Sequence, residues 1–387
     1  MPRTLLERAL ARRVALRLVR LKKHRPIEFK VRTENQLARL PRNLDTELAG
    51  NPGIYSLRFY ERSKWSLGRP SLRANYKRLG HALLGEIDSS SSSATISRSY
   101  SQVQGADISQ AIGGWISGWL GAKPQDFADN IEIVEIKTND GWSLPAWLQR
   151  ANSDTWVIHV HGRGASQAET ARNFAQFHAL GFTNLAISYR NDGTALISHK
   201  PRRGALGLGT SEWGDLEASL SFAMQEGARH VLVFAWSYGA AISLQFAKNS
   251  ALAAKVDGYI FDSPVISWRA TTSLQAHLAG APQHWVSLGE EFLKNAKKAK
   301  SIGLSSAIDF AQFEVSAIAN YFETPTLILH SRDDGYIPIE PCQELADALP
   351  DTVSLVEFEG ARHCKLYNYN LAKYQQAIAD FVASTSN

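Results

Sequence analysis

Residues 231–241, with the sequence VLVFAWSYGAA, constrain the fold of this chain more than any other segment. The first apolar residues predict a buried strand, and residues 240–247 have the spacing of a helix. Ser237 stands between them, at the apex of a sharp turn. This arrangement is typical of a nucleophile elbow, in which the strained serine needs small residues two positions before and after it. Ala235 and Gly239 meet that need, although glycine is usual at both positions.

The positive charge of the chain is concentrated at its N-terminus. The chain has a net charge of +5, whereas residues 1–32 alone hold eleven Lys and Arg against Glu7 and Glu28. The remainder is therefore net negative, so the overall charge does not argue for nucleic-acid binding. Residues 4–23 are rich in helix formers, but their arginines fall among the leucines and leave no clean apolar stripe. Two interpretations stay open: a solvated basic helix or frayed terminus, and peripheral contact with anionic lipid or another acidic surface.

The composition indicates a globular protein without a disulfide framework. Of the 387 residues, 44% are hydrophobic and 20% are charged. No uninterrupted apolar stretch has the length of a signal peptide or a membrane span. Cys342 and Cys364 are the only cysteines, too few for a disulfide framework or a zinc cluster. We therefore expect a cytoplasmic setting, with membrane association through the basic N-terminus as a further option, and no metal or cofactor.

The pattern of apolar residues divides the chain into three parts. Residues 1–32 form the basic helix or tail, and residues 33–130 are expected to be a β-rich accessory region in which the serine run 89–93 is a hairpin tip or a linker. From residue 131 to 387 strands alternate with helices, which predicts an α/β domain with a doubly wound, mostly parallel sheet. The alternation breaks at about residues 269–320, which we expect to form a small helical lid over the active-site edge.

The loop after the predicted strand 156–160 has the sequence HGRG, at residues 161–164. A tetrahedral oxyanion needs two backbone N–H donors that point at the same position. We assign these donors to Tyr238, which follows the candidate nucleophile, and to Arg163, whose glycine neighbours allow close approach of the backbone. His161 is expected to fix the turn rather than to take part in chemistry. Ser166 and Glu169 have the spacing of a capping box for the next helix.

Two later segments offer the groups that would activate Ser237. His363 lies directly after the last predicted strand and can accept the serine proton and return it to a leaving group. Asp334 lies just beyond an earlier strand and can orient that histidine, while Asp333 and Asp262 are the alternative acids. The order Ser237, Asp334, His363 is the one expected for a nucleophile elbow on an α/β sheet. A role for Cys364 as nucleophile would leave the serine elbow without an explanation.

These motifs resemble those of the α/β-hydrolase superfamily over about residues 130–385. Within it, the chain looks most like the prolyl-oligopeptidase-like and serine-aminopeptidase-like groups, including uncharacterised actinobacterial hydrolases. Ala235 departs from the usual glycine, and Ser331 stands where the acid motif normally has glycine. The resemblance implies the α/β-hydrolase fold and a Ser-His-Asp triad, with no cofactor.

The residues predict acyl transfer to water through an acyl-enzyme on Ser237. A carboxylic ester is the first expected substrate class, and a peptide or amide is the second. An acyltransferase or thioesterase, and an inactive binding protein on the same scaffold, are further alternatives. The basic segment 200–203 could bind a carboxylate or phosphate of the substrate or could be a solvated loop.

Overall fold

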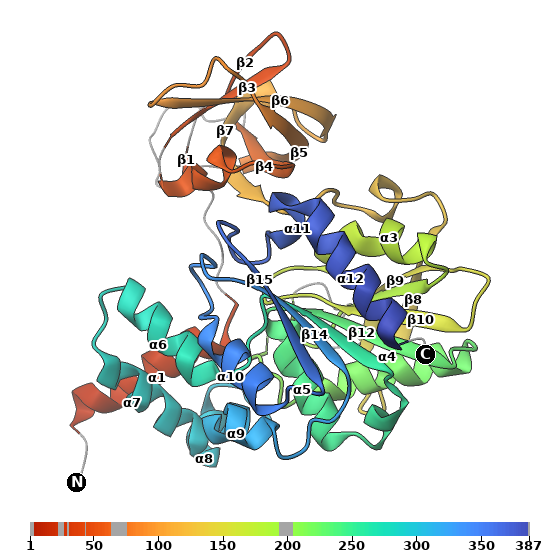
Figure 1. Ribbon diagram of the computed structural model, residues 1–387. Helices are drawn as coiled ribbons and strands as arrows, with labels where there is room; N and C mark the ends of the chain where they lie inside the picture. Colours follow the sequence, from red (N-terminus) through yellow and green to blue (C-terminus); the bar gives the residue numbers. More distant parts are fainter. Residues whose placement is uncertain are drawn as a thin grey trace.

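The computed structural model describes residues 4–21, 27–28, 31–42, 44–62, 76–192 and 204–385. The basic segment 200–203 lies outside these residues. Within them the strands form two sheets, an upper one of seven strands and a lower one of eight (Figure 1). No helix of the described residues is both long enough and apolar enough to cross a bilayer. Both cysteines are free and buried.

The lower sheet has the order β15-β14-β13-β12-β10-β11-β9-β8. Its six neighbouring strands from β15 to β11 run parallel, and β9 and β8 continue the sheet as an antiparallel hairpin. The strands are β8 (Ile131–Lys137), β9 (Ser143–Gln149), β10 (Thr155–Val160), β11 (Thr183–Ile187), β12 (His230–Trp236), β13 (Gly258–Asp262), β14 (Thr326–Ser331) and β15 (Val353–Phe358). The central strands are buried on both faces because helices cover both sides, as expected for a doubly wound fold.

The helices of this part follow the strands along the chain. After β10 the chain forms α2 (Gln167–Thr170), a 3₁₀ turn and α3 (Phe174–Ala179) in place of one continuous helix. The other helices that flank the sheet are α4 (Trp213–Gln225), α5 (Tyr238–Asn249), α10 (Glu340–Ala348), α11 (Leu366–Tyr369) and α12 (Leu371–Thr385). Apolar side chains between these helices and the strands form the main core on each side of the sheet.

The segment between β13 and β14 is helical, in line with the break in alternation seen in the sequence. It contains α6 (Trp268–Leu278), α7 (Gln283–Lys294), α8 (Ala296–Ser301) and α9 (Val315–Ile318). We refer to residues 268–318 as the α6–α9 segment. Because β13 ends at the same edge of the sheet as β12, this segment starts close to the elbow serine.

The upper sheet is antiparallel, with the order β1-β7-β4-β5-β6-β3-β2. Its strands are β1 (Ile27–Glu28), β2 (Arg32–Glu34), β3 (Leu37–Pro41), β4 (Tyr55–Arg62), β5 (Tyr76–Ile87), β6 (Thr95–Gln104) and β7 (Ala111–Ser117). The serine run 89–93 forms the turn between β5 and β6, as predicted. The sheet also includes β1, which lies in the segment that we expected to be a tail.

Helix α1 (Leu5–Val19) corrects the expectation of a solvated helix or a frayed terminus. A capping box starts it, with the Thr4 hydroxyl accepting from the Glu7 amide at 3.2 Å and the Glu7 carboxylate accepting from the Thr4 amide at 2.9 Å. Ala11, Ala15 and Val19 are buried where α1 packs against α7 (Figure 1). The half-buried leucines Leu16, Leu18 and Leu21 also pack against the main core. Because exposed arginines stand between these apolar residues, the sequence shows no clean apolar stripe.

Candidate active site

Ser237 sits on the predicted strand–turn–helix, between β12 and α5. Its backbone has φ 51° and ψ −112°, a conformation that non-glycine residues rarely adopt and that holds strain. A Cβ atom at Gly239 would lie 2.3 Å from the carbonyl oxygen of Val160, so this position requires glycine. Ala235 is fully buried in β12, and its small side chain fits there without glycine. The elbow therefore presents the serine at the carboxyl edge of the sheet.

The loops after β14 and β15 bring Asp334 and His363 to Ser237. The His363 Nε2 atom lies 3.0 Å from the Ser237 Oγ atom, and the His363 Nδ1 atom lies 2.8 Å from the Asp334 Oδ2 atom. The ring is oriented so that its two nitrogens face the hydroxyl and the carboxylate at the same time. Three residues that are 97 and 29 positions apart along the chain thus form one hydrogen-bonded chain.

Asp334 is held as an ionised acceptor. Its other oxygen, Oδ1, accepts hydrogen bonds from the amides of Tyr336 at 2.9 Å and Ile337 at 2.7 Å. Burial alone would raise the pKa of the carboxyl group, but the facing His363 imidazole, the nearby His330 and the Ile337 amide lower it below its usual range. The carboxylate charge is therefore present next to the imidazole at neutral pH.

The same pair changes the basicity of the histidine. Burial of the ring disfavours its charged form, but the Asp334 carboxylate outweighs this and raises the pKa of His363 well above its ordinary value. The Tyr336 ring lies 5.1 Å from the imidazole and covers part of it. His363 is thus prepared to hold a proton taken from Ser237.

The two alternative acids have other partners. The Asp262 carboxylate accepts from the Tyr374 hydroxyl at 3.0 Å and lies 3.6 Å from the Arg172 guanidinium. The Asp333 carboxylate accepts from the Gly360 amide at 2.6 Å and so fastens the loop that carries His363. Neither carboxylate forms a hydrogen bond with the imidazole among the described residues.

Cys364 lies beside the histidine, with its Sγ atom 3.6 Å from the His363 Nε2 atom. Burial raises the pKa of this thiol, although the histidine opposes the shift. A thiol in its protonated form is a poor nucleophile. The geometry therefore agrees with the serine as the reacting group.

The HGRG loop lies against the elbow and is fixed by its histidine. A Cβ atom at Gly162 would lie 3.3 Å from the Ser237 Cβ atom, so the loop backbone runs close to the serine. The buried His161 ring bonds to the Gly162 carbonyl oxygen through Nδ1 and to the Asp192 carboxylate through Nε2. His161 thus holds the turn, as the sequence suggested.

The two expected oxyanion donors belong to this region. Tyr238 is the first residue of α5, and Arg163 follows Gly162 in the loop. Neither backbone N–H has a hydrogen-bond partner within the described part of the chain. Free amides next to a nucleophile are what an oxyanion site requires.

The expected capping box at Ser166 is wrong in one respect. Ser166 does precede α2, but its side chain makes no capping hydrogen bond. The Glu169 carboxylate instead accepts a hydrogen bond from the Gly162 amide at 3.3 Å. Glu169 therefore supports the HGRG loop, a role that its spacing alone could not reveal.

The family of the chain can be stated once this geometry is known. Residues 157–377, more than half of the chain, match the model of the alpha/beta hydrolase family. The chain belongs to this family. No curated protein matches it significantly in sequence.

The first of three solved structures that are similar to this hydrolase supports the same fold. The esterase Pf2001 from Pyrococcus furiosus is 20% identical, with a TM-score of 0.52 over 68% of this chain and 96% of that one. The esterase RhEst1 from a Rhodococcus species is 16% identical, with a TM-score of 0.44 over 65% of this chain and 99% of that one. A bacterial membrane phospholipase A is also 16% identical, with a TM-score of 0.47 over 67% of this chain and 87% of that one.

A buried polar cluster that the sequence did not reveal joins the upper sheet to the histidine loop of the hydrolase. Asn368 donates to the carbonyl oxygens of Ile54 at 2.6 Å and Gly118 at 3.1 Å and accepts from Arg172 at 3.1 Å. Arg172 also donates to the carbonyl oxygens of Gly118 and Cys364. The accessory region therefore contacts the segment that follows His363.

The N-terminal helix contacts the opposite side of the site. The Arg163 guanidinium donates to the carbonyl oxygens of Arg20 at 2.7 Å and Arg17 at 3.4 Å. These carbonyl groups belong to the last turn of α1, where intrahelical partners run out and a cation is favoured. Helix α1 is thus attached to the loop that holds a candidate oxyanion donor.

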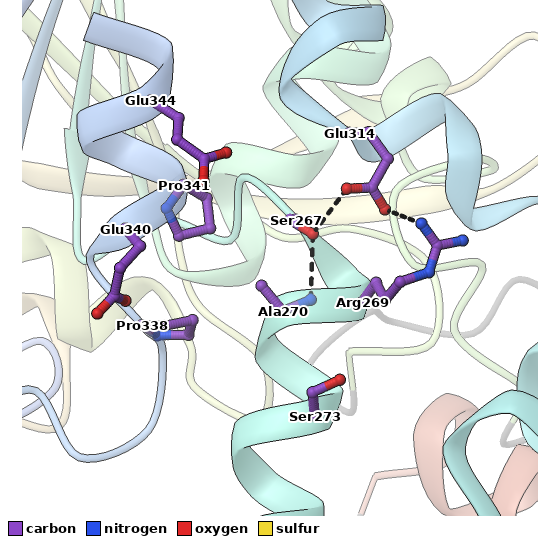
Figure 2. Close-up of a pocket in the computed structure, with 9 residues that line it drawn as sticks. All are labelled: Ser267, Arg269, Ala270, Ser273, Glu314, Pro338, Glu340, Pro341 and Glu344. Atoms are coloured by element: carbon purple, nitrogen blue, oxygen red, sulfur yellow. Dashed lines mark hydrogen bonds and ion pairs between the residues drawn. The ribbon is translucent and has the colours of Figure 1, made fainter. Parts of the chain in front are cut away.

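A cavity of about 340 Å³ lies between the start of α6 and α10 (Figure 2). Its lining is mainly charged or polar and includes the Arg269–Glu314 ion pair. The lining residues are Ser267, Arg269, Ala270, Ser273, Glu314, Pro338, Glu340, Pro341 and Glu344. Because neither Ser237 nor His363 lines it, this cavity is not the pocket of the reacting carbonyl group.

Proposed function

We propose that this alpha/beta hydrolase cleaves a carboxylic ester through Ser237, His363 and Asp334. One observation carries the proposal: a single imidazole bridges the elbow hydroxyl at 3.0 Å and a buried carboxylate at 2.8 Å. A serine hydroxyl is a weak nucleophile unless an adjacent base removes its proton. The arrangement supplies that base together with a group that orients it.

The first half-reaction forms an acyl-enzyme. The Ser237 Oγ atom attacks the ester carbonyl carbon while His363 Nε2 takes its proton, and the imidazolium is stabilised by Asp334. The Arg163 and Tyr238 amides bind the oxyanion. The tetrahedral intermediate then collapses, the bond to the leaving oxygen breaks, and His363 returns the proton to the departing alcohol.

The second half-reaction uses water in place of the alcohol. His363 removes a proton from the water as it attacks the acyl carbon, and the same amides bind the second oxyanion. Collapse breaks the bond to Ser237, whose oxygen regains the proton from His363. One water is consumed, and one acid and one alcohol are released.

Labelling by a fluorophosphonate probe tests the nucleophile. The wild-type chain should be labelled and Ser237→Ala should not, while Ser305→Ala serves as a control at an exposed serine outside the triad. A panel of p-nitrophenyl esters of graded acyl length, next to aminoacyl and peptidyl anilides, tests the substrate class. Labelling of the Ser237→Ala variant would overturn the assignment of the nucleophile.

The same panel separates the alternatives. Faster turnover of the anilides than of the esters would identify a peptidase or amidase, and transfer of the acyl group to an added alcohol or thiol would identify an acyltransferase. Neither labelling nor turnover of any panel member would identify a binding protein and contradict the proposal.

A further inference from the structure

The outward face of α1 differs from the face that docks on α7. At 100° per residue, the buried stripe of Ala11, Ala15 and Val19 lies on one side of the helix. A second set of side chains, all exposed, falls within an arc of about 140° on the other side, where only Leu16 is half-buried against the core. The side chains of this α1 surface are Leu5, Leu6, Arg12, Arg13, Arg17 and Arg20.

The cations of the α1 surface are not neutralised by any acidic side chain that the structure describes. All four arginines are exposed, and within the described residues none of them forms an ion pair. Glu7 is the only acidic residue of the helix, and its carboxylate is occupied by the capping box. A folded helix thus presents four unpaired charges of one sign.

The apolar members of the surface lie at the start of the helix. Leu5 is 85% exposed and Leu6 is 80% exposed, the two largest exposures among the large hydrophobic residues described. Leu278, at the end of α6, is 59% exposed, and Trp285, near the start of α7, is 36% exposed. Figure 1 shows α1, α6 and α7 side by side at one corner of the lower domain.

We propose that the α1 surface binds an anionic lipid bilayer. Arginines on an outward helix face attract anionic headgroups, and leucines at the helix end can enter the boundary with the acyl chains. The phosphates of a nucleic acid would bind the arginines but would offer no apolar contact to the two exposed leucines. The combination of unpaired cations and exposed aliphatic side chains therefore favours lipid.

The position of α1 means that lipid binding would bring the HGRG loop close to the bilayer. Because α1 is rigidly docked on α7, the bilayer would meet the folded body rather than a flexible tail. The last turn of α1 holds the Arg163 side chain. The HGRG loop would then lie beside the lipid surface, while the binding itself does not depend on the proposed ester hydrolysis.

Co-sedimentation of the full chain with phosphatidylcholine vesicles, with and without phosphatidylglycerol, tests the proposal. We expect binding only with the anionic lipid and its loss at high salt. A cation near an anionic leaflet strengthens binding by roughly fivefold. The variant Arg12→Gln/Arg13→Gln/Arg17→Gln removes three such cations and should therefore bind roughly a hundredfold more weakly. The variant Leu5→Gln/Leu6→Gln should also bind more weakly, at unchanged salt dependence.

Matched controls remove the same groups from elsewhere on the surface. Lys248→Gln/Lys255→Gln/Arg229→Gln removes three exposed cations near the opposite end of the sheet, and Leu180→Gln/Leu371→Gln removes two exposed leucines. Both should bind as the wild type does, and circular dichroism should show all variants folded. Absence of binding to anionic vesicles would overturn the proposal. So would equal losses in test and control variants, or tight binding of poly(U) RNA that the leucine changes leave unaltered.

Discussion

Replacing Asn368 with alanine should loosen the contact between the upper sheet and the segment that follows His363. Asn368 is 5% exposed and takes part in three hydrogen bonds, two as donor and one as acceptor. Gly53 allows the two parts to approach closely, since a Cβ atom there would lie 1.7 Å from the Asn368 carbonyl oxygen. The cluster is therefore buried and tightly packed, so its lost hydrogen bonds are not readily replaced by water.

The size of the expected loss in stability follows from the groups that Asn368→Ala leaves without a hydrogen-bond partner. A hydrogen bond contributes about 1 kcal/mol net, and a buried polar group without a partner costs about 1–3 kcal/mol. Arg172 keeps its bonds to the carbonyl oxygens of Gly118 and Cys364, so most of the cost falls on the Ile54 carbonyl group and the removed bonds. We expect a local free energy of opening that is lower by about 2–4 kcal/mol.

Hydrogen exchange measured by mass spectrometry reports this quantity for each segment. Peptides that cover residues 362–371 should exchange about 30- to 900-fold faster in Asn368→Ala, because about 1.4 kcal/mol corresponds to a factor of ten. The control Asn249→Ala removes a bond within α5 to the Gln245 carbonyl oxygen and should leave these peptides unchanged. Unchanged protection of residues 362–371 in Asn368→Ala would refute the reasoning.

Three further predictions follow from the site and from the helix that flanks it. Asp334→Asn removes the charge that raises the pKa of His363. Because His363 must be neutral to act as a base, the acid limb of the plot of kcat/KM against pH should move to lower pH. The value of kcat should also fall by about 10⁴-fold. Gly239→Ala places a Cβ atom against the Val160 carbonyl oxygen and should lower the free energy of unfolding by about 1–3 kcal/mol, measured in urea, with loss of probe labelling. Gly289→Leu should displace α1 from α7, because even a Cβ atom there would lie 2.6 Å from a valine methyl group of α1, and trypsin should then cleave the arginines of α1 faster.

Each of these variants has a neighbouring control. Asp333→Asn should leave the acid limb in place, since Asp333 does not contact the imidazole; a shift equal to that of Asp334→Asn would contradict the assignment of the acid. Gly214→Ala adds a Cβ atom with no heavy atom nearer than 4.0 Å and should be tolerated. Trypsin cleavage of α1 at the wild-type rate in Gly289→Leu would show that the helix does not depend on the α7 contact.

The α/β part of the fold could be predicted because its short apolar runs and the motifs that follow them match the strands and loops of the structure. Buried parallel strands appear as short apolar runs, and each motif follows such a run. The parallel topology then carries the ends of β12, β14 and β15 to one edge, so that Ser237, Asp334 and His363 meet although they are distant in sequence. Chain order alone left three acids open, and only the distances separate Asp334 from Asp262 and Asp333.

The hydrogen bonds that hold the histidine loop could not be predicted, because they join residues that are far apart in the sequence. Asn368 and Arg172 look like ordinary polar residues in helical segments, and their partners are backbone carbonyl groups, which carry no sequence signal. The docked face of α1 was missed for a different reason. The closest contact between α1 and α7, at Gly289, depends on small residues, and arginines interrupt the leucines that also pack inward, so the apolar periodicity is weak.

The strained backbone of the site shows why such supports are needed. Ser237, Ser263 and Cys364 all have positive φ values, of 51°, 50° and 53°, and such conformations cost about 1–3 kcal/mol each. Hydrogen bonds connect these residues to one another and to the sheet. The Cys364 amide donates to the Ser263 hydroxyl at 3.1 Å, the Ser263 amide donates to the Leu329 carbonyl oxygen at 2.8 Å, and the Ser237 amide donates to the Asp262 carbonyl oxygen at 2.9 Å. The strain therefore persists only while β13, β14 and the histidine loop stay in register, and the contacts of the upper sheet with that loop help to maintain this register.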